Sequence, residues 1–591
     1  MSRDQFGWIE TFMATLAGAG VRDVVVCPGS RSTPLALAVD VTPELVCHRA
    51  VDERAAAFFA LGQTRLTGRP GAVVCTSGTA AAHFLPAVIE AAQSFLPLLL
   101  LTADRPWELV GVAAPQTMDQ HSLFGAYARG YLELGAHEPA LADAVVQRVA
   151  VQAVTRSLSP TPGPVQVNVR LRKPLEPTPP WPTEPRRPSA NRSPTRVFLP
   201  RISPAVEALD VLARRIAAAK RGLIVCGPTI LDRRSEPLRE AVRRLAKASG
   251  FVLLAETTSQ ARFGPTDPDV VTCSSFDVVL RDAAFREAFQ PDLILELGAP
   301  PTSGNYADYV SKCAGADRFV VAPHGWNDPA QDAVGLVFAD PAEVCCELAK
   351  RLSGRTPSPD PLWTEAFRRV DALVWTLAEQ HAPGPTLTEA TVARTVISRC
   401  PNDAVFVVGN SLPVRDVDVW APPRTQHLDV LHQRGVSGID GLIAGAAGTA
   451  SVASRPVVLL LGDTSTLHDL TSLALARHVS TPLVIVVVQN QGGRIFERLP
   501  IVRAIDRERF DKFFTMCEPV DLEHAAEAFG VAFVRTNDTE TFVQRFDEAV
   551  HRVGATLIEA VVPPDDGTQR AARFRAEVTE KLRDLMQEVK P

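Results

Sequence analysis

The stretch GDTSTLHDLTSLALARHVSTPLVIVVVQNQGG, which runs from Gly462 to Gly493, decides the fold. An apolar run leads into Gly462 and Asp463, a helical segment follows, and a second apolar run ends at Asn490. Apolar strands separated by helices are typical of buried parallel sheets. The carboxyl ends of neighbouring strands in such sheets lie at one edge, where open α/β folds bind ligands. The stretch therefore predicts a strand-helix-strand unit that brings Asp463 and Asn490 together.

The same alternation of short apolar runs and helical patterns extends along the whole chain and predicts an α/β protein. We expect three domains, each a mainly parallel sheet flanked by helices. Proline is concentrated at 174–204 and again at 354–361, where it can continue neither a helix nor a central strand. The predicted parts are a first domain at 1–178, a Pro-rich linker at 179–203, a central α/β domain at 204–353, a linker and helix at 354–385, and a third domain at 386–591.

The first and third domains share a succession of elements. AVVCTSG at 72–78 leads through a helical stretch into PLLLLTADRP at 97–106, as VVLLLGD at 457–463 leads into PLVIVVVQN at 482–490. This likeness fits either an ancient duplication or two ordinary strand-helix-strand units. The central domain has no GxGxxG after any strand, so the sequence does not support dinucleotide binding there, and we expect a mainly structural role.

Composition narrows the class of protein. The net charge is −6 over 591 residues, and Lys and Arg are scattered, which disfavours nucleic acid as a partner. The ten cysteines form no CxxC pair, which favours a reducing compartment over a zinc site or a disulfide framework. The N-terminus is polar, and no run reaches the ~18 apolar residues of a membrane span. We expect a cytoplasmic protein without a signal peptide.

The residues at the two strand ends are suited to a hard cation. Mg²⁺ prefers a few oxygen ligands in near-octahedral geometry, completed by phosphate oxygens. The carboxylate of Asp463, the amide of Asn490 and the backbone carbonyl of Gly492 could supply them, since glycine lets the backbone approach closely. The alternative interpretation is a Gly-Asp turn beside an unrelated strand end.

The same stretch resembles the thiamine diphosphate motif, which begins Gly-Asp-Gly and ends Asn-Asn. Thr464 and Gln489 depart from that motif, but neither stands at an expected ligand position. The segments at 48–62 and 68–82 resemble the pyrimidine-binding domain of this superfamily, with Glu53 at the position of its glutamate. The resemblance implies that Glu53 hydrogen-bonds the aminopyrimidine ring and promotes deprotonation of the thiazolium carbon. By residue type alone, Glu53 would be a solvated surface charge.

Further motifs narrow the resemblance to one family, the 2-succinyl-5-enolpyruvyl-6-hydroxy-3-cyclohexene-1-carboxylate synthases of menaquinone biosynthesis. The motifs are CPGSRSTPL at 27–35, TADRPWEL at 102–109, APQTMDQ at 114–120, VGNSLPVR at 408–415, QRGVSGIDG at 433–441 and GGRIFERLP at 492–500.

The family resemblance implies a transferase, a carboligase that decarboxylates 2-oxoglutarate and adds the succinyl unit to isochorismate. The implied cofactors are thiamine diphosphate and Mg²⁺, with Mn²⁺ as a substitute. It also implies a homodimer or homotetramer with active sites at the subunit interface, because one chain of the superfamily supplies the glutamate and its partner the metal site. The implied substrate-binding residues are Ser30, Arg31, Arg105, Gln116, Ser411, Arg415, Arg434, Phe496 and Leu499, and the implied cofactor-binding residues are Glu53, Ile439, Asp463, Asn490, Gly492, Ile495 and Phe496.

One departure lies in the central domain. Family members carry a basic pair where this chain has Gly304 and Asn305, neither of which supplies positive charge. Either another arginine compensates or the carboxylates of isochorismate are held differently, so we assign no catalytic residue to this domain. The corresponding hypothesis is a weaker affinity for isochorismate.

Two other functions stay open. Another thiamine diphosphate enzyme, such as an acetolactate synthase or a 2-oxoacid decarboxylase, would share Glu53, Asp463 and Asn490 but would not need the arginine motifs. A non-catalytic binding subunit is disfavoured by those same three residues, although Gln489 and the Gly304-Asn305 pair keep that interpretation open.

Overall fold

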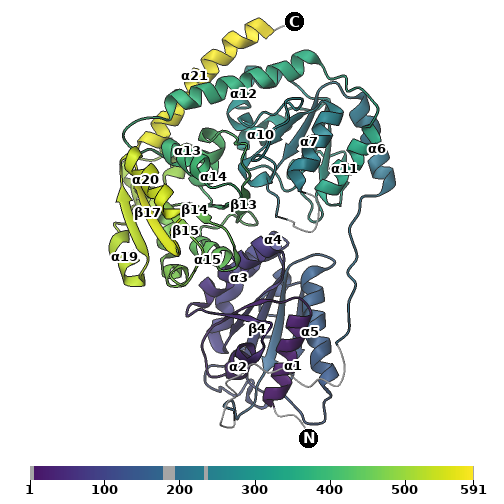
Figure 1. The fold of residues 1–591 in the computed structure, drawn as a ribbon, viewed down its shortest axis with the longest axis vertical. Helices are drawn as coiled ribbons and strands as arrows, with labels where there is room; N and C mark the ends of the chain where they lie inside the picture. The colour runs from purple at the N-terminus through teal and green to yellow at the C-terminus, as the bar shows by residue number, and fades with distance from the viewer. Residues whose placement is uncertain (1–4, 178–193, 232–236, 590–591) are drawn as a thin grey trace. The chain divides into compact units, whose positions relative to one another are not determined.

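Three parallel sheets form the framework of the protein (Figure 1). The computed structural model describes residues 5–177, 194–231 and 237–589. Each strand pairing recorded within the three sheets is parallel, as the near-continuous apolar strands predict. The predicted α/β fold class, with mainly parallel sheets flanked by helices, is confirmed.

The first sheet has six strands in the order β2-β1-β3-β4-β6-β5. Every residue of β3, β4 and β6 is buried, which is why these strands read as apolar runs. The strands are β1 (Asp23–Val26), β2 (Val46–Arg49), β3 (Gly71–Cys75), β4 (Leu98–Asp104), β5 (Gly130–Leu134) and β6 (Pro164–Arg170), and the α-helices of this region are α1 (Gln5–Gly18), α2 (Thr33–Val41), α3 (Glu53–Thr67), α4 (Leu85–Gln93) and α5 (Asp143–Leu158).

The third sheet has its six strands in the order β13-β12-β14-β15-β17-β16. When the strands of each sheet are numbered along the chain, the first and third sheets share the order 2-1-3-4-6-5. The likeness seen between their apolar runs therefore extends to the whole strand order. The strands are β12 (Val405–Val408), β13 (Asp429–His432), β14 (Val457–Gly462), β15 (Leu483–Gln489), β16 (Ala532–Thr536) and β17 (Ala555–Val561), and the longer helices of this region are α13 (Glu389–Arg399), α14 (Leu412–Trp420), α15 (Leu442–Val452), α16 (Asp463–His468), α19 (Leu522–Phe529), α20 (Thr539–Ala549) and α21 (Asp566–Val589).

The middle sheet has five strands in the order β11-β10-β9-β7-β8. Its strands are β7 (Gly222–Cys226), β8 (Val252–Ala255), β9 (Leu293–Leu297), β10 (Asp317–Val321) and β11 (Gly335–Val337), and its helices are α6 (Val206–Ala218), α7 (Leu238–Ser249), α8 (Phe276–Val279), α9 (Ala283–Ala288), α10 (Gly304–Val310) and α11 (Pro341–Leu352).

Two compact units organise these elements. One contains residues 1–201, 433–454 and 468–481, and the other contains 202–432, 455–467 and 482–591. Helix α15 therefore groups with the first sheet, although it follows β13 in the chain.

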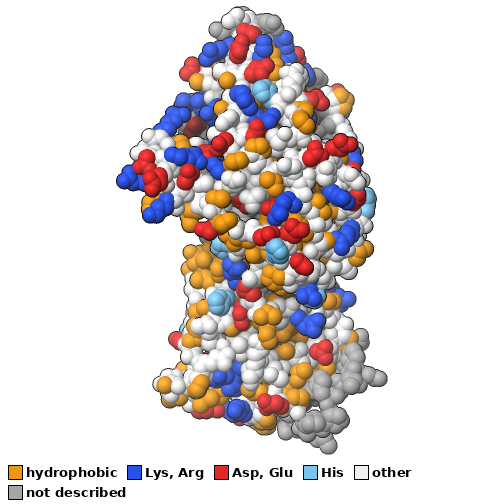
Figure 2. All heavy atoms as spheres, turned by 90° about the vertical axis from the view of Figure 1, so that its left-hand side faces the viewer, with side chains coloured by type: hydrophobic (Ala, Val, Ile, Leu, Met, Phe, Trp, Pro, Cys, Tyr) orange, Lys and Arg blue, Asp and Glu red, His pale blue; other side chains and the backbone are white. Residues whose placement is uncertain are grey.

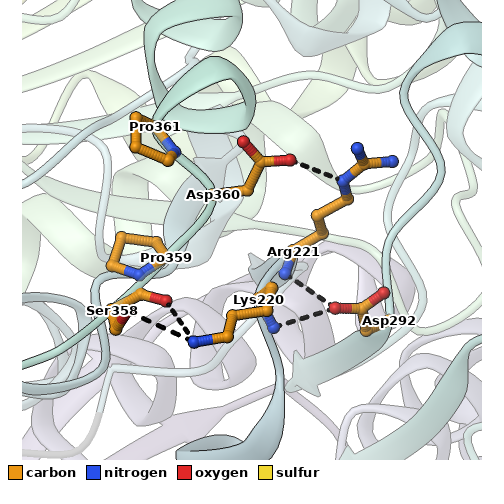
Figure 3. Close-up of a pocket in the computed structure, with 7 residues that line it drawn as sticks. All are labelled: Lys220, Arg221, Asp292, Ser358, Pro359, Asp360 and Pro361. Carbon is orange, nitrogen blue, oxygen red and sulfur yellow. Dashed lines mark hydrogen bonds and ion pairs between the residues drawn. The ribbon is translucent and has the colours of Figure 1, made fainter.

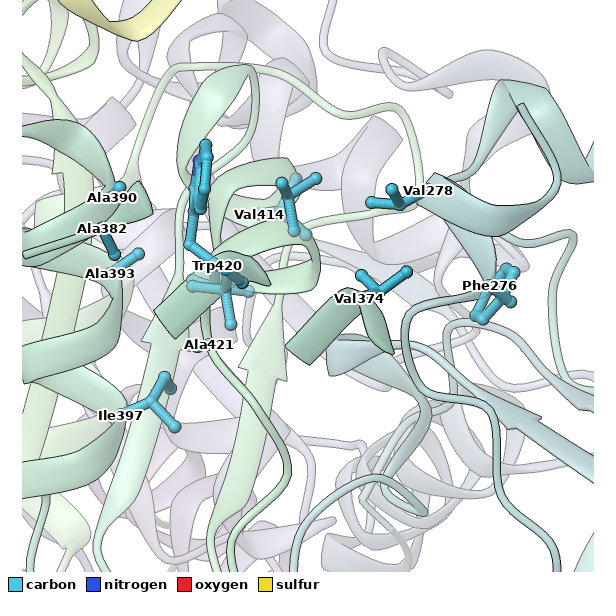
Figure 4. Packing of buried hydrophobic residues seen from close by; sticks show 14 of the residues in the cluster. Phe276, Val278, Val374, Ala382, Ala390, Ala393, Ile397, Val414, Trp420 and Ala421 are labelled. Atoms are coloured by element: carbon cyan, nitrogen blue, oxygen red, sulfur yellow. The ribbon is translucent and has the colours of Figure 1, made fainter. Parts of the chain in front are cut away.

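One apolar core runs through the second unit from the middle sheet to the third (Figure 4). Helix α12 (Pro361–His381) joins its two halves, because Phe367 packs against Phe285, and Val374 belongs to the same cluster as Trp420. Helix α12 also lies beside α21 (Figure 1). The helix expected after the second proline-rich segment is thus a buried part of the core.

The surface and the connecting segments complete the description. On the face drawn in Figure 2, basic and acidic side chains are interspersed. Within the described residues, no helix is both long and apolar enough to cross a membrane. Of the Pro-rich linker expected at 179–203, residues 179–193 lie outside the described part of the chain, and 194–203 contain neither helix nor strand.

Candidate active site

A surface hollow near the middle sheet is lined by none of the predicted site residues (Figure 3). Lys220 and Arg221 precede β7, and Asp292 precedes β9, so the hollow is at the amino-terminal edge of the sheet. Asp292 accepts both backbone amides at 2.8 and 2.9 Å, Arg221 Nε lies 2.9 Å from Asp360, and Lys220 Nζ donates to the Ser358 carbonyl at 3.1 Å. Parallel sheets bind ligands at the opposite edge. These contacts fasten the start of α12 to the sheet.

The expected metal ligands stand at the carboxyl ends of β14 and β15. These strands are neighbours, with Gly462 opposite Val488. One carboxylate oxygen of Asp463 accepts the Gly492 amide at 2.8 Å, and the other accepts the Thr464 amide at 2.6 Å. The strand-helix-strand unit therefore brings Asp463 and Gly492 into direct contact, through the Gly492 amide.

Only glycine fits at position 492. Its φ is +105°, a conformation that side chains rarely adopt, and a Cβ there would lie 2.1 Å from the Thr515 carbonyl oxygen. The Gly493 amide donates to that same carbonyl at 2.7 Å, and Arg494 Nε donates to the Asn490 carbonyl at 2.9 Å. The loop that would present the ligands is thus fixed by its own hydrogen bonds.

Asn490 and Asp463 are the polar side chains of this loop edge. Asn490 is 5% exposed, and its Nδ2 donates to Glu389 Oε1 at 2.6 Å, which leaves its carbonyl oxygen for another partner. Burial raises the pKa of Asp463, although the Gly492 and Thr464 amides oppose that shift. No cluster of three His, Cys, Asp or Glu side chains in the described residues could hold a metal. A cation here would rely on one carboxylate with amide, carbonyl and phosphate oxygens, which is the kind of site that suits Mg²⁺.

The remaining predicted residues of the second unit follow β12 and β15. Ser411 stands at the N-terminus of α14 with a φ of +70°, and its backbone carbonyl accepts Arg415 Nη1 at 2.6 Å. A non-glycine residue in this conformation is costly and is common at functional sites. Ile495 and Phe496 lie in a short 3₁₀ helix, where the Phe496 ring is 5.6 Å from that of Phe514, and Leu499 is 47% exposed.

Arginines gather at the carboxyl edge of the first sheet. Arg31 follows β1, is 5% exposed and donates to the Leu171 carbonyl at 2.6 Å. Arg105 follows β4 and donates to the Pro115 carbonyl at 2.8 Å. Burial lowers the pKa of Arg31, and the charge of Arg105 lowers it further. Among the described residues, neither guanidinium has an ion pair with a carboxylate, so this edge could accept an anion.

The neutral residues of this edge have fixed backbones. Gln116 has a φ of +54°, and its Nε2 donates to the Ser77 carbonyl at 3.1 Å, just beyond β3. Ser30 is exposed, and its carbonyl accepts the Thr33 amide at 3.3 Å. The structure therefore places Ser30 and Gln116 with Arg31 and Arg105 at one sheet edge.

Glu53 begins helix α3 and is partly buried. Its neighbour Asp52 caps the helix by accepting the amides of Arg54 and Ala55 at 2.9 and 3.3 Å. The pKa of the buried Cys27 thiol, which directly follows β1, is raised by burial and then by the charge of Glu53. The Glu53 carboxylate is therefore near the end of β1, and its side chain is only partly exposed.

Helix α15 and the loop before it belong to the same unit as Glu53. Asp469 is fully buried and accepts the amides of Ile443 and Ala444 at 2.8 and 2.9 Å, while Arg54 lies 3.9 Å from it. This contact ties the start of α3 to the start of α15. Ile439 lies in the loop just before α15, so the structure brings its segment to the helix that begins at Glu53.

Two residues that support the site were missed from the sequence. Glu90 is 1% exposed and accepts the amides of Gly435 and Val436 at 3.0 and 2.8 Å, which fixes the segment after Arg434. Glu389 is the partner of Asn490. Glu90 is the charged residue of the otherwise apolar helix α4. It could have been recognised from the sequence on that ground, because a buried charge needs a partner.

Gly304 and Asn305 of the central domain supply no positive charge. Gly304 has open space around it, and Asn305 Nδ2 donates to the carbonyl and the carboxylate of Asp277 at 2.9 and 3.2 Å. Where the resemblance led us to expect a basic pair, the chain has a glycine and a neutral amide that already has an acidic partner.

Comparison with known proteins identifies the two cofactor-binding regions. Residues 9–123 match the N-terminal TPP binding domain of thiamine pyrophosphate enzymes, and residues 419–560 match the C-terminal TPP binding domain. A structure of a Mycobacterium smegmatis protein proposed to be a thiamin diphosphate-dependent enzyme has a TM-score of 0.70 at 19% identity, covering 95% of this chain and 100% of that one. This likeness shows the fold.

Curated relatives match along nearly the whole chain. A protein of Sorangium cellulosum is 51% identical and covers 97% of this chain and 95% of its own length. A protein of Myxococcus xanthus is 38% identical, with 97% of each chain covered, and one of Geobacillus kaustophilus is 38% identical, with 92% of each covered. All three carry the name 2-succinyl-5-enolpyruvyl-6-hydroxy-3-cyclohexene-1-carboxylate synthase.

Proposed function

This chain belongs to the 2-succinyl-5-enolpyruvyl-6-hydroxy-3-cyclohexene-1-carboxylate synthase family, and we propose that it decarboxylates 2-oxoglutarate and adds the succinyl unit to isochorismate. One observation carries the proposal: at the carboxyl edge of the first sheet, Arg31 and Arg105 have no carboxylate partner among the described residues. Both substrates bear carboxylates, and the planar fork of arginine binds such groups bidentately.

The proposal includes thiamine diphosphate with Mg²⁺, for which Mn²⁺ can substitute. Asp463, Asn490 and Gly492 would hold the cation, and the fit is supported by the contact of the Asp463 carboxylate with the Gly492 amide and by the glycine-only backbone at position 492. When bound, thiamine diphosphate supplies the nucleophilic carbon and the electron sink for loss of CO₂.

The protein's own residues would bind and orient the cofactor and the substrates, and they would exclude water. Glu53 would hold a proton in a hydrogen bond to the aminopyrimidine nitrogen, which is general acid-base work. Ile439, Ile495 and Phe496 would form apolar walls that weaken the solvation of the 2-oxoglutarate carboxylate before CO₂ leaves. The remaining proposed substrate contacts are those of Ser30, Gln116, Ser411, Arg415, Arg434 and Leu499.

A product assay tests this function. The purified full-length protein receives thiamine diphosphate, Mg²⁺, isochorismate and equal amounts of 2-oxoglutarate and pyruvate. We expect consumption of 2-oxoglutarate and a succinylated cyclohexene product. Formation of acetolactate from pyruvate would instead establish another thiamine diphosphate enzyme, the second candidate.

A homo-oligomer with active sites at its subunit interface is also part of the proposal, and it rests on the family. Mixing Glu53→Gln with Asp463→Ala protein under conditions that exchange subunits tests it. If the two residues come from different chains, a mixed dimer keeps one intact site, and an equal mixture should recover about a quarter of wild-type activity. If they come from the same chain, the mixture stays inactive.

A further inference from the structure

The side chain of Asn490 has two unlike ends. An asparagine amide presents a carbonyl oxygen that accepts and an NH₂ group that donates, and only the oxygen can bind a cation. If the amide were turned over, the NH₂ group would face the cation and binding would be lost. Something must therefore fix the orientation of this amide.

Glu389 contacts the donor end of that amide. Its Oε1 lies 2.6 Å from Asn490 Nδ2, and the two residues are 6% and 5% exposed, so water does not compete freely for either group. In its ionised form the Glu389 carboxylate accepts hydrogen bonds and does not donate them, so in that form it selects the NH₂ end of the amide. The Asn490 carbonyl oxygen is then the end that is left to face a ligand.

The position of Glu389 is itself fixed. It is the first residue of α13, where Thr388 and Thr391 form a reciprocal capping box and where the helix dipole favours a negative charge. Its other oxygen lies against Gly567, at which a Cβ would come within 1.8 Å of Glu389 Oε2. The carboxylate is therefore held from two sides and has little freedom to turn away from Asn490.

We propose that Glu389 is a positioning residue of the cation site, which takes the amide hydrogens of Asn490 and so aims the Asn490 carbonyl oxygen at the cation. This inference rests on the proposed function, because it needs the cation that Asp463, Asn490 and Gly492 would hold. Groups that orient metal ligands in this way contribute about 10–100-fold to metal affinity.

Calorimetric titration of Mg²⁺ into the full-length protein with saturating thiamine diphosphate tests the inference. We expect Glu389→Ala to weaken Mg²⁺ binding about 10–100-fold. Glu389→Gln should weaken it less, because the introduced glutamine keeps an acceptor oxygen. The matched control is Glu296→Gln, which alters an equally buried glutamate that accepts hydrogen bonds from Tyr306 and Arg318, and which should bind Mg²⁺ like the wild type.

A second measurement separates positioning from a purely structural role at the start of α13. In the Asn490→Asp background, the introduced aspartate offers only acceptors, so Glu389→Gln now supplies the donor that the pair lacks. We expect Glu389→Gln to lower Mg²⁺ affinity in the wild-type background and to raise it in the Asn490→Asp background, a coupling that a double-mutant cycle measures. An equal loss in both backgrounds would overturn the inference.

The failure of this inference differs from failure of the proposed function. If the Glu389→Ala protein bound Mg²⁺ as tightly as the wild type, the positioning role of Glu389 would be wrong, although the cation site itself would stand. A wild-type protein that binds neither Mg²⁺ nor thiamine diphosphate would sink the proposed function itself.

Discussion

The first and third sheets have the same strand order but different chemistry at the carboxyl ends of β4 and β14. In the third sheet, Asp463 follows β14 and accepts two backbone amides, with no basic side chain bonded to it among the described residues. In the first sheet, the carboxylate at the end of β4, Asp104, is paired with Arg170 at 3.1 Å, and Arg31 and Arg105 stand beside it.

This difference shows that the shared fold positions a site at the carboxyl ends of the strands, whereas the residues at those ends determine what the site can bind. The third sheet presents oxygens that suit a cation and, through it, a diphosphate. The first sheet presents guanidinium groups that suit carboxylates. One architecture can thus serve cofactor and substrate in a single enzyme.

The largest effect should come from Glu53, which tests whether the first sheet also contributes to the chemistry. We expect Glu53→Gln to lower kcat about 100–10,000-fold, because the proton held at the aminopyrimidine is lost. Binding of thiamine diphosphate, measured by calorimetry, should persist. Unchanged turnover would contradict the role of Glu53.

The arginine edge should show a smaller effect, on substrate binding. Arg31→Gln should cost about 2–5 kcal/mol of binding, seen as a rise in the KM for the carboxylate substrate it holds. The control is Arg172→Gln, since Arg172 is exposed and pairs with Glu108 at 2.7 Å on the surface. Equal KM values for both variants would remove Arg31 from the site.

Helix α3, which begins at Glu53, packs closely against α15, so we expect a single added methyl group between them to lower the stability of the protein. At Gly62 of α3, a Cβ would lie 1.9 Å from the Gly445 carbonyl, so Gly62→Ala should cost about 1–3 kcal/mol of stability, seen as a lower Tm. Gly445→Ala is the matched control on α15, because its Cβ would meet nothing closer than 3.8 Å. Similar Tm values for the two variants would show that the helices are not packed so closely.

The smallest effect concerns the missing basic pair. Gly304→Lys adds a cation in open space and should lower the KM for isochorismate by a few-fold. Asn305→Arg should do less, because Asp277 would neutralise the new charge. If neither variant binds isochorismate more tightly, the departure in the central domain has no bearing on substrate affinity.

The parallel sheets and the strand-helix-strand unit of β14 and β15 were accessible from the sequence, because apolar runs and glycine positions are local signals, whereas the strand order was not predicted. The domain limits at 178, 203, 353 and 385 stay predictions. Glu389 and Glu90 were not assigned, since each contacts a residue more than 100 positions away, although a charge within an apolar helix is a local signal for Glu90. The grouping of α15 with the first sheet was missed for the same reason, because it depends on contacts such as that between Gly62 and Gly445.

Calorimetric titration of Mg²⁺ and thiamine diphosphate into Asp463→Ala and Arg105→Ala proteins, beside the wild type, tests the division between the two edges most directly. We predict that Asp463→Ala binds the cofactor too weakly to measure, whereas Arg105→Ala binds it as the wild type does and instead loses affinity for 2-oxoglutarate or isochorismate. Equal cofactor binding by both variants, or its loss in Arg105→Ala alone, would contradict the account.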